Sequence, residues 1–228
     1  MKSISPVETY KSLFSELFVK LISFSLEDEF EEDLMDSVAF FYGLEEGDRY
    51  EFKPEDEFLF LCWFLLDDTD ADGHCLLDTF TERHSDSLSL QETQICKALR
   101  ETNLTLLEVR DVIDGKSLVL KDLFLGEEFT VQEALGSQGI APGTLLYTRV
   151  LKLSDVRFLV GAGLFLNSQV VEPLTTYILT IFQEECELSG ELNMRSFLKE
   201  NGELINHWIQ AYQKGEMPTA VPDEGGGE

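Results

Sequence analysis

The spacing of the apolar residues changes twice along this chain of 228 residues. Up to about position 103, and again after about position 168, apolar side chains recur at every third or fourth residue, which is typical of amphipathic helices. Between these positions they alternate with polar residues, which is typical of strands. The sequence therefore predicts an α+β protein whose helical N- and C-terminal parts flank a small five-stranded antiparallel β-barrel.

The first hundred residues contain clear helix boundaries. Ser5 and Glu8 have the spacing of a capping box, and Pro6 suits the first position of a helix. We expect a second helix to begin at Ser25, with Ser25 as its N-cap, and to end at Gly43.

A third helix is predicted to begin at Pro54 and to continue through the apolar run from Phe58 to Leu66. This run is apolar on all sides, so we expect it to lie centrally and to be covered by other elements. Ser89 and Glu92 form a further capping box. The remaining helices are expected over residues 76–84, 89–100, 168–182, 192–198 and 204–212.

Five strands are expected in the middle of the chain, as a meander. The dipeptide Asp114–Gly115 predicts a two-residue hairpin of type I′, which needs positive φ at both positions. An open meander would leave two unpaired edges, so we expect closure into an SH3-like or OB-like barrel. The strands are expected over residues 105–113, 116–121, 127–132, 144–153 and 156–160.

These patterns divide the chain into four segments. Residues 1–102 form an acidic helical region, residues 103–163 the barrel, and residues 164–214 a second helical region. Residues 215–228 are predicted to be a disordered tail, because its prolines and glycines leave nothing to bury.

Charge is the strongest feature of the composition. The chain has 44 acidic and 17 basic residues, a net charge of −27. Between Glu27 and Asp78 there are 19 acidic residues, and Arg49 and Lys53 are the only basic ones. Such a surface repels nucleic acid and anionic lipid and attracts basic proteins, although an acidic face also simply keeps a protein in solution.

The cysteines and the hydropathy of the chain indicate in which cellular compartment the protein is expected. Cys62, Cys75, Cys96 and Cys186 form no C-x-x-C pair, and nothing implies an oxidising compartment, so we expect free thiols. The longest apolar run is too short for a membrane span of about 20 residues. No signal peptide is visible, and a cytoplasmic location is expected.

The segment Asp68-Thr69-Asp70-Ala71-Asp72-Gly73 matches the first half of a calcium loop. Asp68, Asp70 and Asp72 are therefore weak candidate metal ligands. The twelfth position, where such a loop has glutamate, holds Thr79, so a turn-forming acidic loop is the preferred interpretation.

No other cofactor or catalytic site is predicted. His74, Cys75 and His84 are too few and too unevenly spaced for a zinc site. The chain has no phosphate loop, no nucleophile elbow and no dinucleotide-binding motif. The barrel region has six basic and eight acidic residues and few aromatic ones, which favours a structural barrel over one that binds single-stranded nucleic acid.

The middle of the chain resembles a group of uncharacterised bacterial proteins that often end in a SEC-C zinc motif. The likeness covers about residues 58–160 and rests on several segments in the same order, among them Trp63–Asp67, Ser117–Val131 and Pro142–Leu146. The resemblance implies a cytoplasmic bacterial protein and supplies no reaction. The zinc-binding element itself is absent, so no zinc ligand is carried over.

Three functions stay open on the sequence alone. The preferred one is a non-enzymatic binding or adaptor protein with an acidic surface for a basic protein partner. The second is a hydrolytic enzyme that uses carboxylates in a cleft between helices and barrel; two or more buried acidic residues in such a cleft would favour it, and their absence would weigh against it. The third is an acidic mimic of nucleic acid. The oligomeric state is left open.

Overall fold

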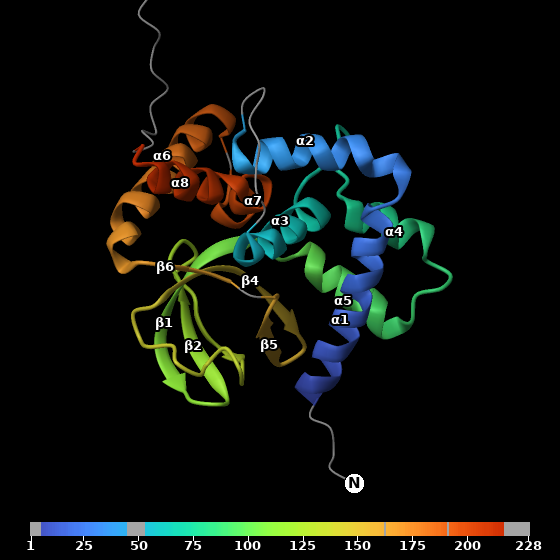
Figure 1. Cartoon of the computed structure of the whole chain (residues 1–228), viewed down its shortest axis with the longest axis horizontal. Helices are drawn as coiled ribbons and strands as arrows, with labels where there is room; N and C mark the ends of the chain where they lie inside the picture. The colour runs from blue at the N-terminus through green and yellow to red at the C-terminus, as the bar shows by residue number, and fades with distance from the viewer. Residues whose placement is uncertain (1–5, 45–52, 162, 191, 217–228) are drawn as a thin grey trace, which may run out of the picture.

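The computed structural model describes residues 6–44, 53–161, 163–190 and 192–216. Within these residues helices flank a nearly closed, five-stranded antiparallel barrel, so the predicted α+β class is confirmed (Figure 1). The described part of the chain contains no helix of the length and hydropathy that crossing a membrane requires.

The N-terminal helices follow the predicted spacing closely. Their bounds are α1 Pro6–Ser25, η1 Asp28–Phe30, α2 Glu31–Tyr42, α3 Pro54–Leu66, α4 Leu76–Arg83 and α5 Leu90–Arg100. Gly43 ends α2 with a left-handed φ of 59°, and Ser89 and Glu92 form the expected capping box of α5. The predicted N-cap Ser5 lies outside the described residues.

The prediction that Ser25 caps a second helix is wrong. The first helix continues to Ser25, whose hydroxyl donates to the carbonyl of Ile22 instead of accepting from a following amide. A short 3-10 turn, η1, then precedes α2. Serine can bond backwards within a helix as well as cap one, and sequence spacing does not distinguish the two.

The strands form a Greek key, not the predicted meander. Their bounds are β1 Leu104–Ile113, β2 Ser117–Asp122, β3 Glu128–Gln132, β4 Leu145–Leu153, β5 Val156–Leu159 and β6 Leu164–Leu166. The hydrogen-bonded order is β3-β2-β1-β4-β5, so β4 returns to pair with β1, and β6 adds to β4. Of the two barrel types left open, this order fits the five-stranded Greek-key OB type.

The β1–β2 hairpin also differs in detail. Ile113 pairs with Ser117, so the loop between them has three residues, and Lys116 donates its amide to the carbonyl of Ile113. Gly115 has a φ of 67°, whereas Asp114 does not have positive φ. The turn is therefore not type I′, and glycine is required at one position only.

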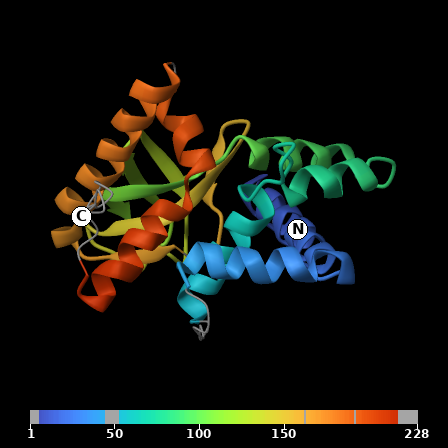
Figure 2. The ribbon, with the colours of Figure 1, turned by 90° about the horizontal axis from the view of Figure 1, so that it is seen from above.

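The C-terminal helices pack against α2 and the barrel. They are η2 Ser168–Val170, α6 Val171–Ser189, α7 Met194–Glu200 and α8 Glu203–Lys214. Figure 2 shows α6 and α8 on one side of the molecule and α1, α4 and α5 on the other. Asn206 of α8 donates to the carbonyl of Phe41 at 2.6 Å, which joins the two helical parts directly.

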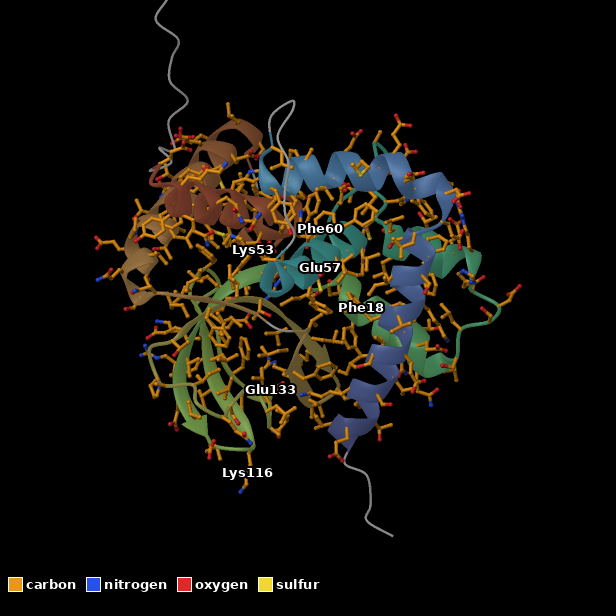
Figure 3. All side chains as sticks on the ribbon, in the orientation of Figure 1. Phe18, Lys53, Glu57, Phe60, Lys116 and Glu133 are labelled. Atoms are coloured by element: carbon orange, nitrogen blue, oxygen red, sulfur yellow. The ribbon has the colours of Figure 1, made fainter. Side chains whose placement is uncertain are left out.

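Helix α3 lies between these two groups and contributes to two apolar clusters, as its all-round apolar sequence predicts. Cys62, Leu65 and Leu66 pack with α1, α4 and α5, while Phe60 and Trp63 pack with α2, the barrel and the C-terminal helices. In Figure 3 Phe60 lies on this helix between α2 and the barrel.

Two of the three apolar clusters cross the predicted segment boundaries. Phe14 of α1 packs on Phe158 of β5, with ring centroids 6.0 Å apart. The hydroxyl of Tyr147 in β4 donates to the carbonyl of Gly202 at 2.9 Å. The third cluster is the barrel interior, formed by Leu107, Val109, Leu118, Leu120, Val131 and Leu146. Most of the predicted disordered tail, residues 217–228, lies outside the described residues.

Candidate functional site

A pocket of about 290 Å³ lies between α2 and the loop that connects α3 to α4. Asp33 and Asp36 line it from α2, and Asp68 and Asp70 line it from the loop. Apolar side chains also line this acidic pocket, namely Phe30, Phe64 and Leu76. It therefore combines a ring of carboxylates with apolar walls.

Asp70 shapes the loop on one side of the acidic pocket. Its Oδ1 accepts the amide hydrogens of Asp72 and His74, each at 2.9 Å, and Gly73 takes the left-handed φ of 80° that the turn requires. The hydrogen bond from the His74 amide is the largest cause of the lowered pKa of Asp70. This carboxylate is therefore both a turn former and a fixed negative charge at the pocket.

Asp68 lies deeper in the acidic pocket. The hydroxyl of Ser37 in α2 donates to its Oδ2. Burial is the main cause of the raised pKa of Asp68, and the negative charges of Asp33 and Asp67 raise it further. A cation placed in the acidic pocket would relieve this repulsion, because an opposite charge favours the ionised carboxylate.

One imidazole, that of His74, also lines the acidic pocket, and its charge adds to the hydrogen bonds that lower the pKa of Asp70. Among the residues that the structure describes, none of the four carboxylates of the pocket forms an ion pair with lysine or arginine. The chain just before Asp33, in η1 and the first turn of α2, has further exposed acids, of which Glu29 pairs with Arg83. The other exposed acids there are Glu27, Asp28, Glu31 and Glu32.

The three candidate calcium ligands do not converge on one point. Asp68 turns toward Ser37, Asp70 bonds to its own loop, and Asp72 is exposed. In the described ranges, no group of three or more His, Cys, Asp or Glu side chains is placed to hold a metal ion. The hydrogen bonds of Asp70 show that this acidic loop is built around a turn.

The His/Cys cluster is also dispersed. His84 packs against the ring of Phe80, with centroids 4.7 Å apart. Cys75 is buried next to Asp78, and Arg100 donates to its sulfur at 3.3 Å. All four cysteines are unpaired, as the sequence predicts.

A comparison with known protein families gives one match. The model of a family of unknown function, DUF7986, matches residues 1–186. The chain belongs to this family. No curated protein and no solved structure matches it. The match does not bear on the resemblance to proteins associated with the SEC-C motif, which stays a prediction.

This DUF7986 chain has a second polar centre that its sequence does not reveal. Arg149 of β4 is fully buried and pairs with the buried carboxylate of Asp67, which also accepts from Lys199 at 2.6 Å. Arg149 donates to the carbonyl and the hydroxyl of Thr102 as well, at 2.9 and 2.8 Å. This ion network joins α3, the end of α5, β4 and α7.

The DUF7986 structure also bears on the enzyme hypothesis. One cleft between helices and barrel contains Asp122, which is buried, and the exposed residues Glu101 and Glu127. A second cleft lies between the α3–α4 loop, the end of α5 and α7, and contains buried Asp67, with Glu101 and Glu200 exposed. Each of these clefts thus has a single buried carboxylate among the described residues, fewer than a carboxylate pair for acid–base catalysis needs.

Proposed function

We propose that this protein is a non-enzymatic binding or adaptor protein whose acidic pocket receives a lysine or arginine side chain of a basic protein partner. The observation that carries the proposal is the set of four aspartates around the pocket without an ion-paired cation among the described residues. A cytoplasmic location is part of the proposal and is consistent with the four free cysteines.

The shape of the acidic pocket supports a long basic side chain over a metal ion. Lysine and arginine have an apolar stem and a charged head, and they bury the stem against apolar surface. Phe30, Phe64 and Leu76 supply such a surface, and the carboxylates lie around it. The exposed acids at the start of α2 would attract neighbouring basic residues of the same partner and speed the encounter.

The test uses a tetralysine and a tetraarginine peptide as probes, with fluorescence anisotropy as the readout. We expect binding that weakens with salt, and that weakens about tenfold in the double variant Asp33→Asn/Asp36→Asn because two charges are lost. The matched control is Glu184→Gln/Glu187→Gln, which removes the same charge from exposed positions of α6.

Equal loss in both double variants would mean that the peptide responds to net charge alone, and the acidic pocket would then not be the site. Two further experiments test the two alternative functions. Competition between duplex DNA and the protein for one basic partner would favour nucleic-acid mimicry. Hydrolysis that Asp122→Asn abolishes would favour the enzyme.

A further inference from the structure

The inward-facing side chains of the barrel are apolar in its interior and include charged ones at one end. Along β4 the inward side chains run from Leu146, in the apolar interior, through Val150 to Lys152. In β5 the partner of Lys152 is Arg157, so the two cations are directly opposite on neighbouring strands. Like charges directly opposite each other repel and destabilise a sheet, and an anion between them would remove this repulsion.

This end of the barrel is open and forms a cleft of about 460 Å³. Its walls continue the inward-facing positions of the barrel strands, and α5 and α7 contribute to its rim. Binding sites often lie in the mouths of β-barrels. The barrel positions in the wall are Thr105, Asp122, Phe129, Val150, Lys152 and Arg157.

Of the three cations that line this barrel mouth, Lys152 and Arg157 have no charged partner among the described residues, whereas Arg195 is paired. Among the described residues, neither Lys152 nor Arg157 forms an ion pair, and the Arg157 guanidinium lies over the ring of Phe129, 4.9 Å from its centroid. At the rim, Glu127 is paired with Arg195 at 3.0 Å.

Asp122 is also occupied, because its carboxylate accepts from the Thr105 hydroxyl at 3.0 Å and from the amides of Phe124 and Leu125 at 2.9 and 2.8 Å. Glu101 is the remaining carboxylate of the cleft and is exposed. Among the described residues of the barrel mouth, Lys152 and Arg157 are therefore cations whose charge no carboxylate compensates.

We propose that the barrel mouth binds a small oxyanion, a phosphate or carboxylate group of a small molecule, between Lys152 and Arg157. Arginine and lysine donate charge-assisted hydrogen bonds to such groups. The net charge of −27 and the acids at the rim oppose a long polyanion, because each additional phosphate would meet negative surface. A single anionic group held between Lys152 and Arg157 lies next to two positive charges and needs no further contact with the negative surface. This site is separate from the acidic pocket and independent of the proposed partner.

The test follows backbone amide resonances of the full chain during titration with sodium phosphate and, separately, sodium acetate, with ionic strength held constant by sodium chloride. We expect saturable shifts concentrated at Phe129, Val150, Lys152 and Arg157. The stronger of the two titrations identifies the preferred oxyanion.

Lys152→Met is the decisive variant. Lys152 is exposed, so its replacement leaves the apolar core intact, and thermal unfolding checks that the variant is folded. We expect binding of the preferred oxyanion to weaken about tenfold because one charge-assisted donor is lost. The matched control is Lys116→Met, which removes an exposed lysine from the β1–β2 hairpin at the opposite end of the barrel (Figure 3).

Three results would overturn the proposal. The first is the absence of saturable shifts with either anion, and the second is equal weakening in the Lys152 and Lys116 variants. The third is tight binding of a single-stranded oligonucleotide at the barrel mouth without binding of phosphate or acetate, which would assign the site to nucleic acid instead.

Discussion

Glu203 is a carboxyl group that the fold buries in the first turn of α8. Burial is the largest cause of its raised pKa, which is about 7 instead of 4.5. A hydrogen bond from Trp63 favours the ionised form and lowers the pKa by a smaller amount. Because the folded state holds this proton more tightly than the unfolded state, the contribution of Glu203 to stability is greatest below pH 4.5. It is lost as the pH rises toward about 7.

Glu203→Gln should therefore stabilise the protein above pH 7 and change little near pH 4, because glutamine still accepts from Trp63 and is never charged. We expect a gain of roughly 1 to 3 kcal/mol in the free energy of unfolding at about pH 8, measured by urea denaturation. Glu200→Gln, at an exposed position, is the control. A gain of the same size at both pH values would contradict this account.

At the scale of single elements, helix caps and hydrophobic periodicity depend on residues only a few positions apart. The elements that they specify could therefore be predicted from the sequence. The ends of α3 and α5 and the positions of the five barrel strands lie close to those expected from sequence. The predictions that were wrong concern residues that can adopt either of two local hydrogen-bonding patterns or backbone conformations. Ser25 bonds backwards instead of capping, and Asp114 does not adopt the positive φ of a type I′ turn.

The exit from β5 shows how an element depends on its neighbour. Gly161 has a φ of 73°, and a Cβ there would lie 1.9 Å from Cε1 of Phe58 in α3. Glycine is thus required both for the backbone conformation and for the close approach of α3.

Gly161→Ala should cost at least about 2 kcal/mol more than Gly139→Ala, because displacing a packed ring adds to the backbone strain. Gly139 is a matched control, since its φ is 79° and a Cβ there would meet no atom within 4 Å. Chemical denaturation of both variants measures the difference. Equal losses would mean that Phe58 moves aside freely.

At the scale of the whole molecule, Arg149 joins parts of the chain that sequence analysis treats separately. It is fully buried, bonds to Asp67 and Thr102, and leaves only its Nε without a partner. Removing one member of such a network leaves a buried charge uncompensated, which is more damaging than losing an exposed ion pair.

Arg149→Met should accordingly lower the free energy of unfolding by about 3 to 5 kcal/mol. The double variant Asp67→Asn/Arg149→Met should lose clearly less than the sum of its single changes, because the unpaired carboxylate is then also removed. The control Arg110→Met breaks the exposed pair with Glu108 and should cost less than about 1 kcal/mol. Additive losses at Asp67 and Arg149 would show that the two side chains are energetically independent.

The net charge of −27 is also a property of the whole molecule. Mutual repulsion among surface carboxylates destabilises the compact state and is screened by salt. The midpoint of thermal unfolding should therefore rise between about 20 mM and about 300 mM sodium chloride at neutral pH. A falling midpoint would mean that attractive ion pairs dominate the surface.

The amino-acid sequence by itself determined the class of the fold, the helix and strand periods, the central place of α3 and the turn-forming nature of the Asp68–Gly73 loop, because these depend on neighbours within a few positions. It also located the acidic segment from Glu27 to Asp78, part of which lines the acidic pocket. It did not specify which of those carboxylates come together.

Only the tertiary structure decided the Greek-key strand order, the network of Arg149 with Asp67 and Lys199, and the pairing of Lys152 with Arg157 at the barrel mouth. These contacts join distant parts of the chain or depend on the register between strands. A buried arginine in a strand looks the same in sequence as an exposed one. The packing of α3, α5 and α7 against the barrel is what removes Arg149 from water and makes its partners matter.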